Sequence, residues 1–131
     1  MAKKLTKPQI EAMAKEIRKW LLDHYLWVDV TIYFNGKAYS TDDRNGHYFY
    51  NDPEHLVELE NQDPHRFTEY AGDILTMVFE GDLYDLINHP WEFGYTPEYG
   101  EKLLEEFRSI FNKRGLYFEL GNLWNLSAFY P

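Results

Sequence analysis

The feature that most constrains the fold is a short apolar stretch in the middle of the chain, residues 73–80 (Asp-Ile-Leu-Thr-Met-Val-Phe-Glu). Side chains along a β-strand alternate between its two faces, so this stretch would place apolar groups on both. Its β-branched and aromatic members, and the bounding glycines Gly72 and Gly81, favour a strand over a helix. A strand that is apolar on both faces needs cover on both. We therefore expect it at the centre of a sheet, with Val78 buried.

Two main helices are predicted, at about residues 8–24 and 97–114. Pro8 and Pro97 suit the first position of a helix, and Thr96 suits the N-cap of the second. Apolar residues recur at helical spacing in both segments, which predicts one buried face on each helix.

Two further signals concern helix ends. Gly115 stands where a glycine commonly follows the last turn, so it is expected to end the second main helix. A shorter helix is predicted from Asp82, as its N-cap, to the pair His89-Pro90.

Residues 28–50 predict a three-stranded meander. Residues 28–35 alternate strictly between apolar and polar side chains, which is typical of a strand. Asn35-Gly36 and Asn45-Gly46 are strong signals for two-residue hairpin turns, because both residue types tolerate positive φ. Residues 47–50 would form the third strand. The turns would pair Ile32 with Tyr39, Val30 with Thr41, and Thr41 with Tyr50, all on the core face.

Residues 51–72 carry weaker signals. Asp52-Pro53 and Asp63-Pro64 both resemble helix starts, with aspartate as N-cap and proline first. Residues 56–60 could form a helical turn or a short edge strand, and of the two we expect the strand. After the second dipeptide, a short helix would contain Phe67, Tyr70 and Ala71.

The C-terminal residues 116–130 predict a last hairpin around Gly121-Asn122. A two-residue turn would pair Phe118 with Asn125, whereas a three-residue loop would give a better apolar face. We prefer the three-residue loop, because a slip of one residue turns a whole strand over. It would align Leu116, Phe118 and Leu120 with Trp124, Leu126 and Ala128.

These elements predict one α+β domain spanning residues 1–131, built in two layers. Its sheet would be mostly antiparallel, with about five to seven strands, and the two main helices would pack on it. The length of 131 residues and the 44% hydrophobic content suffice for a real core.

Composition excludes several classes of protein. The chain has no cysteine, which removes disulfides and thiolate chemistry and fits a cytoplasmic location. No apolar run approaches the roughly 20 residues of a membrane span, and no signal peptide is evident. The five histidines lack the spacings of metal ligands, and no motif for catalysis or cofactor binding is present. We therefore expect a non-enzymatic protein without a cofactor or metal.

The net charge of −9 is unevenly distributed. Residues 1–20 carry six Lys/Arg and two Glu, whereas residues 21–131 carry seven Lys/Arg and twenty Asp/Glu. A body this acidic repels a phosphate backbone, so direct binding to nucleic acid is disfavoured. It suits a basic partner protein.

Two groups of side chains are candidates for partner binding. The acidic segment, in which Arg44 is the only formal positive charge, consists of Asp42, Asp43, Asp52, Glu54, Glu58, Glu60 and Asp63. The aromatic segment consists of Trp91, Phe93, Tyr95 and Tyr99. Carboxylates can steer a basic partner, and aromatic side chains often anchor interfaces. The alternative for each is structural: a solvated face for the acids and a lid over the sheet for the aromatics.

This profile predicts a small protein that binds and occludes another macromolecule. Inhibitors of nucleic-acid enzymes, such as anti-CRISPR or anti-restriction proteins, and immunity proteins that neutralise basic toxins share it. The alternative is a domain that binds a small molecule or carbohydrate with aromatic platforms and carboxylates; an enzyme is the third possibility. A deep pocket lined by Trp and Tyr would favour the ligand-binding domain. Converging titratable groups with perturbed pKa values would favour the enzyme.

Overall fold

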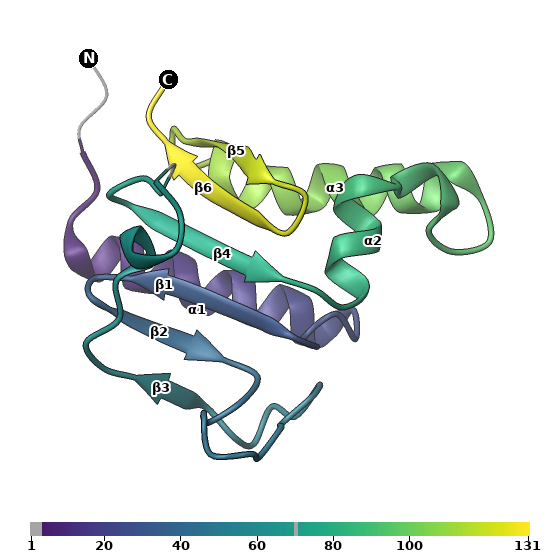
Figure 1. Cartoon of the computed structure of the whole chain (residues 1–131). Helices are drawn as coiled ribbons and strands as arrows, with labels where there is room; N and C mark the ends of the chain where they lie inside the picture. Colours follow the sequence, from purple (N-terminus) through teal and green to yellow (C-terminus); the bar gives the residue numbers. More distant parts are fainter. Residues whose placement is uncertain (1–3, 70) are drawn as a thin grey trace.

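The computed structural model describes residues 4–69 and 71–131 and has the predicted α+β architecture (Figure 1). The helices are α1 Lys7–Asp23, α2 Asp82–Asn88 and α3 Pro97–Asn112, with short 3₁₀ turns η1 Pro64–Arg66 and η2 Pro90–Glu92. The strands are β1 Val30–Phe34, β2 Lys37–Ser40, β3 Val57–Leu59, β4 Leu75–Phe79, β5 Tyr117–Asn122 and β6 Asn125–Phe129. They form one antiparallel sheet in the order β3-β2-β1-β4-β6-β5.

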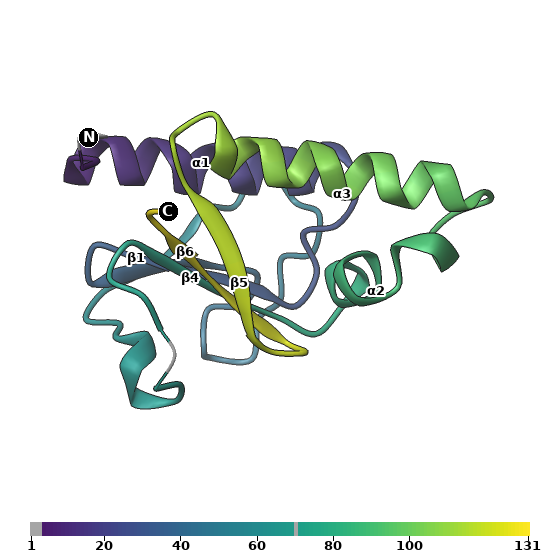
Figure 2. The same ribbon diagram turned by 90° about the horizontal axis from the view of Figure 1, so that it is seen from above.

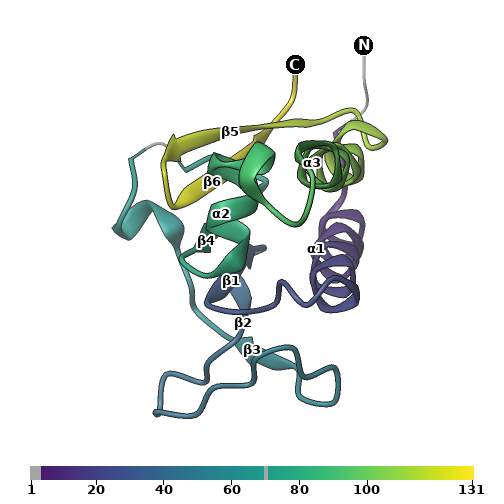
Figure 3. The ribbon, with the colours of Figure 1, turned by 90° about the vertical axis from the view of Figure 1, so that its right-hand side faces the viewer.

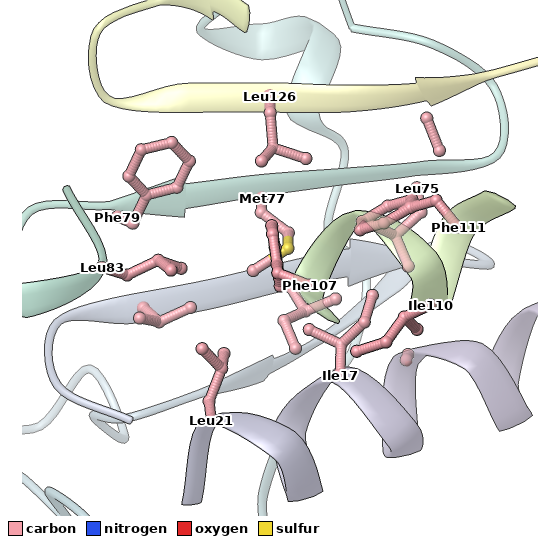
Figure 4. Close-up of a cluster of buried hydrophobic side chains, with 14 of the residues drawn as sticks. Ile17, Leu21, Leu75, Met77, Phe79, Leu83, Phe107, Ile110, Phe111 and Leu126 are labelled. Carbon is pink, nitrogen blue, oxygen red and sulfur yellow. The ribbon is translucent and has the colours of Figure 1, made fainter. Parts of the chain in front are cut away.

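The central position of the apolar stretch is confirmed, because β4 lies between β1 and β6. Met77 is fully buried, opposite Ile32 on one side and Leu126 on the other. Figure 4 shows these β4 and β6 side chains meeting those of α1 and α3 in one apolar cluster.

The two main helices cover only one face of the sheet (Figures 2 and 3). They contact each other, and Glu16 in the middle of α1 forms ion pairs with Lys113 and Arg114 at the C-terminal end of α3, the latter at 2.7 Å. The buried apolar stripes of α1 and α3 face the sheet, as their spacing predicts.

The opposite face of the sheet, here called the polar face, differs from expectation. It carries Thr31, Ser40, Thr76, Val78 and Ser127, and Val78 is only half-buried rather than buried. The small hydroxyl side chains on this face are buried, and each keeps a hydrogen-bond partner on the neighbouring strand. Thr31 bonds to Ser40 at 3.0 Å, and Thr76 bonds to Ser127 at 2.7 Å.

Loop residues cover part of the polar face: the Arg44 guanidinium lies 3.4 Å from the Thr31 hydroxyl, and the Phe67 ring packs on Tyr33. The side-chain nitrogen of Asn125, opposite Val78, is buried here without a hydrogen-bond partner among the described residues.

Local chemistry sets the helix starts. Thr6 and Gln9 form a reciprocal capping box at α1, and the Thr96 hydroxyl accepts a hydrogen bond from the Tyr99 amide at α3. The helices end one and two residues earlier than predicted, and Gly115 has the expected positive φ of 77°.

The predicted N-cap role of Asp82 is wrong. Asp82 is the first residue of α2, Gly81 is the N-cap, and no side chain caps the helix. A side chain at position 81 would collide with the Val28 carbonyl oxygen, because a Cβ there would lie 2.5 Å from it. The close approach of the two backbones therefore requires glycine at the N-cap position, and α2 begins without a capping side chain.

The first hairpin is confirmed, with Ile32 opposite Tyr39 and positive φ at Asn35 and Gly36. The second differs. The Asp43 amide donates to the His47 carbonyl, so the loop contains three residues, 44–46, instead of two.

This longer loop changes the register and removes the predicted third strand. Phe49, rather than Tyr50, donates its amide to Thr41, and only an isolated bridge joins Asp42 to Tyr48. The Asp43 carboxylate stabilises the wider loop by accepting the amides of residues 45 and 47.

The strand predicted at residues 56–60 is confirmed as β3. The helix predicted after Asp63 is reduced to η1, capped by the Asp63 carboxylate on the His65 amide. Its expected member Tyr70 lies outside the described residues.

In the last hairpin the preferred register is wrong by two residues: Phe118 pairs with Ala128 and Leu120 with Leu126, where the three-residue loop would pair them with Leu126 and Trp124. The turn contains two residues, 123 and 124, and lies further along the chain than Gly121-Asn122. Asn122 pairs with Asn125, and a shift in register after Leu120 absorbs the extra residue.

Candidate functional site

The acidic segment begins directly after β2 in the chain and includes the edge strand β3. Its seven carboxylates lie on the loop between β2 and β3, on β3 itself and on the turn before η1, in the lower part of Figure 1. Arg18 of α1 holds part of this loop, because its guanidinium donates to the carbonyls of Asp52 at 3.4 Å and His55 at 3.3 Å.

Three aspartates of the acidic segment share one local arrangement. In each, one carboxylate oxygen accepts the backbone amide two residues further on, and the carboxylate also bonds to a histidine ring nitrogen. The pairs are Asp43 with His47 at 2.7 Å, Asp52 with His55 at 2.5 Å and Asp63 with His65 at 2.9 Å. Each carboxylate is therefore held in one direction at the surface.

Sequence reasoning missed these pairs because it searched the histidines for metal-ligand spacing. The available signal is an aspartate two to four residues before a histidine in a turn-rich segment, which occurs at His47, His55 and His65. Aspartates in such segments turn back to bond nearby backbone amides.

These contacts favour the ionised carboxylates. Partial burial works against ionisation of Asp43, but donors from Asn45 and His47 outweigh it and lower its pKa. The hydrogen bond from His65 lowers the pKa of Asp63, and the same bond raises the pKa of His65. These two carboxylates therefore favour the negatively charged form more than free aspartates do.

The remaining acids of the segment are less uniform. Asp42 accepts the Arg44 amide at 2.9 Å and approaches its guanidinium at 3.5 Å. Glu58 forms an ion pair with Lys37 at 2.7 Å. Glu54 and Glu60 form no side-chain ion pair with any described residue, so their charges are available to a partner.

The aromatic segment lies at η2, the following loop and the first turn of α3. Trp91 and Tyr99 are each 52% exposed, Tyr95 is fully exposed, and Phe93 packs partly against the core. Gly94 has a positive φ of 85°, and a Cβ there would lie 2.4 Å from the Tyr99 ring, so only glycine fits. The loop therefore presents its rings from a constrained backbone.

The structure does not bring the two candidate groups together. In Figures 1 and 3 the acidic segment lies around β2 and β3, whereas η2 and the start of α3 lie on the far side of α2. Each group must therefore act alone or contact a different part of one large partner.

A hollow of about 230 Å³ lies between the β1–β2 turn and η1. Its lining includes Tyr33, Asp63, His65 and Asp73, and the His65 Nε2 atom lies 3.8 Å from an Asp73 carboxylate oxygen. Thr76 also lines it, but its hydroxyl is fully buried and bonded to Ser127. This arrangement pairs a histidine with two carboxylates but offers it no exposed nucleophile.

Among the described residues, no three His, Asp or Glu side chains are arranged to hold a metal ion. No described helix is both long enough and apolar enough to cross a membrane. Comparison of the chain with known protein families, with curated proteins and with solved structures finds no match.

Proposed function

We propose that this chain is a non-enzymatic acidic protein that binds and occludes a basic surface of another macromolecule. The observation that carries the proposal is the repeated aspartate–histidine arrangement, in which Asp43, Asp52 and Asp63 are each held by a turn amide and an imidazole. Carboxylates ordered before binding lose less conformational entropy when a partner arrives.

Electrostatics supports a protein as the partner. The net charge of −9 repels the phosphate backbone of nucleic acid, so direct nucleic-acid binding is disfavoured. A basic groove that normally receives phosphates would instead be attracted to the acidic segment. Inhibition of a nucleic-acid enzyme, in the manner of anti-CRISPR or anti-restriction proteins, and neutralisation of a basic toxin both fit this chemistry.

A second candidate is binding of a small molecule or carbohydrate at the aromatic segment. It is favoured by a hollow of about 200 Å³ beside η2, lined by Asp85, His89, Glu92, Phe93 and Gly94. Ligand pockets typically measure about 300–1,000 Å³, so this hollow would hold only part of a ligand. Occlusion of a macromolecule is therefore the preferred function.

The test begins with affinity capture and mass spectrometry to identify a partner, followed by binding kinetics at two salt concentrations. The variant Glu54→Gln/Glu60→Gln removes two charges that make no described ion pair. Association should slow about two- to fivefold, and its salt dependence should weaken, because exposed charges act mainly on encounter rates.

The matched control is Glu101→Gln/Glu106→Gln, which removes two exposed charges from α3. It should leave the association rate close to that of the unmodified chain. If the two variants slow association equally, the effect belongs to total charge. If neither changes it at either salt, the acidic segment does not steer the partner.

A further inference from the structure

The two edge strands of the sheet, β3 and β5, differ in length and in the number of charged side chains on or next to them. The β3 edge has three residues, and Glu58 and Glu60 place charges on it or next to it. The β5 edge has six residues and a single charged side chain, Glu119. Proteins usually shorten or charge exposed edges to prevent added strands from pairing there. β3 follows this rule closely, whereas the longer β5 is protected only by Glu119 and by the shift in register after Leu120.

The outer side of β5 is accessible. Tyr117 is 37% exposed and Leu120 is 42% exposed. β5 is the last strand in the order of the sheet, so no described strand pairs with it on the side away from β6. An edge strand directs alternate backbone N–H and C=O groups away from its only neighbour, so β5 presents unpaired groups to solvent.

A hollow flanks β5 on each face of the sheet. On the helix side, a hollow of about 360 Å³ is lined by Glu105, Arg108, Asn112, Tyr117 and Phe118. On the polar face, a hollow of about 430 Å³ is lined by Glu69, Ala71, Glu119, Leu120, Gly121 and Phe129. Side chains of a strand added beside β5 would alternate between these two hollows.

The hollows differ in chemistry. The one on the polar face has two carboxylates, Glu69 and Glu119, and no cation among its lining residues. It suits a lysine or arginine side chain. The one on the helix side contains the Phe118 ring, with the Arg108 guanidinium 5.7 Å from its centre. The rest of this lining, except Tyr117, is charged or amide-bearing, so an apolar side chain would pack only on the part of Phe118 that remains exposed.

We propose that β5 accepts an extended segment of a partner protein as an additional strand. Lysine or arginine side chains of the segment face Glu69 and Glu119, and its alternate apolar side chains face Phe118. A second copy of this chain is a poorer occupant, because each copy has a net charge of −9 and would bring its own Glu119 to the shared edge. The proposal does not rest on the acidic segment, which lies at the other edge.

The test uses a synthetic peptide of about seven residues, with blocked ends and alternating lysine and valine. Binding is measured by calorimetry in about 0.15 M salt, and amide hydrogen exchange locates the site. The peptide should slow exchange within residues 117–122. Methylation of alternate backbone nitrogens should abolish binding, because the ladder of main-chain hydrogen bonds is lost. Replacing its lysines by glutamates should weaken binding at least about tenfold.

Matched variants separate the edge from total charge. Glu119→Lys should weaken peptide binding at least about fivefold, whereas Glu60→Lys, with the same charge change beside β3, should change it less than about twofold. Glu69→Lys provides a second variant outside the sheet in case Glu119→Lys disturbs folding.

Several results would overturn the proposal. They are no binding at about 1 mM peptide, equal binding of the methylated peptide, and protection that maps to residues 42–63 instead of β5. Protection of β5 without peptide, together with dimer formation, would assign the edge to a second copy. Loss of partner association in the Glu54/Glu60 variant alone would leave the β5 proposal standing, so the two ideas fail separately.

Discussion

Substitution of two adjacent residues in β4 tests which face of the sheet the helices cover. Met77 is fully buried between Ile32 and Leu126 on the helix side. Val78 points to the polar face, opposite Thr31, and is half-buried. Replacing each by alanine changes the same strand at neighbouring positions, so the cost in β-propensity is similar and the difference reports burial.

The expected costs differ clearly. Truncation of a fully buried methionine to alanine removes apolar contacts and leaves a cavity, which costs about 3 kcal/mol. Truncation of the half-buried Val78 should cost about 1 kcal/mol or less. With an unfolding entropy of about 2.1 cal/mol/K per residue, a chain of 131 residues should lose about 11 °C in Tm for Met77→Ala and about 4 °C for Val78→Ala.

Urea unfolding followed by tryptophan fluorescence measures both variants, since Trp27 is fully buried in the folded chain. The slope of free energy against urea should be unchanged, so that midpoints compare directly. If Val78→Ala is as destabilising as Met77→Ala, the polar face is covered as well and the assignment of layers is wrong.

The other predictions concern helix ends and a histidine. Thr96→Ala should lower the free energy of unfolding by about 1 kcal/mol through loss of the cap on α3. Gly115→Val, at a φ of 77°, should cost at least about 1 kcal/mol, and an unchanged urea midpoint would contradict the helix end. Asp63→Asn should lower the pKa of His65, measured by NMR titration of the imidazole, because the hydrogen bond that the imidazole donates to the Asp63 carboxylate raises this pKa. The pKa of His65 is higher folded than unfolded, so its contribution to stability is complete below about pH 6.5 and disappears as pH rises through the folded pKa. An unchanged His65 midpoint in Asp63→Asn would show that the pair does not form.

The sequence predicted features whose cause is local. Thr96 and Gly115 mark a helix start and end through the chemistry of one or two backbone groups, and Asn35-Gly36 sets a turn through tolerated positive φ. The apolar stretch of β4 also predicted its central position, because a strand apolar on both sides is poorly suited to an edge.

For the candidate sites, the sequence predicted an excess of carboxylates and exposed aromatic rings but not their arrangement. The bonds that hold Asp43 and Asp52 depend on the conformation of the β2–β3 loop, which Arg18 of the distant helix α1 helps to hold. The Arg18 contacts join residues far apart in the chain and leave no periodic pattern in the sequence.

Two properties were decided only by tertiary structure. The first is which face of β4 the helices cover, because Met77 and Val78 look equally apolar until the packing of α1 and α3 distinguishes them. The second is strand order, which makes β5 an edge and places a hollow on each of its flanks. Alternation along a strand specifies its two faces but does not specify which helices or strands lie next to it. The sequence therefore predicted most of the elements, whereas long-range strand pairing and helix packing decided which surfaces remain exposed.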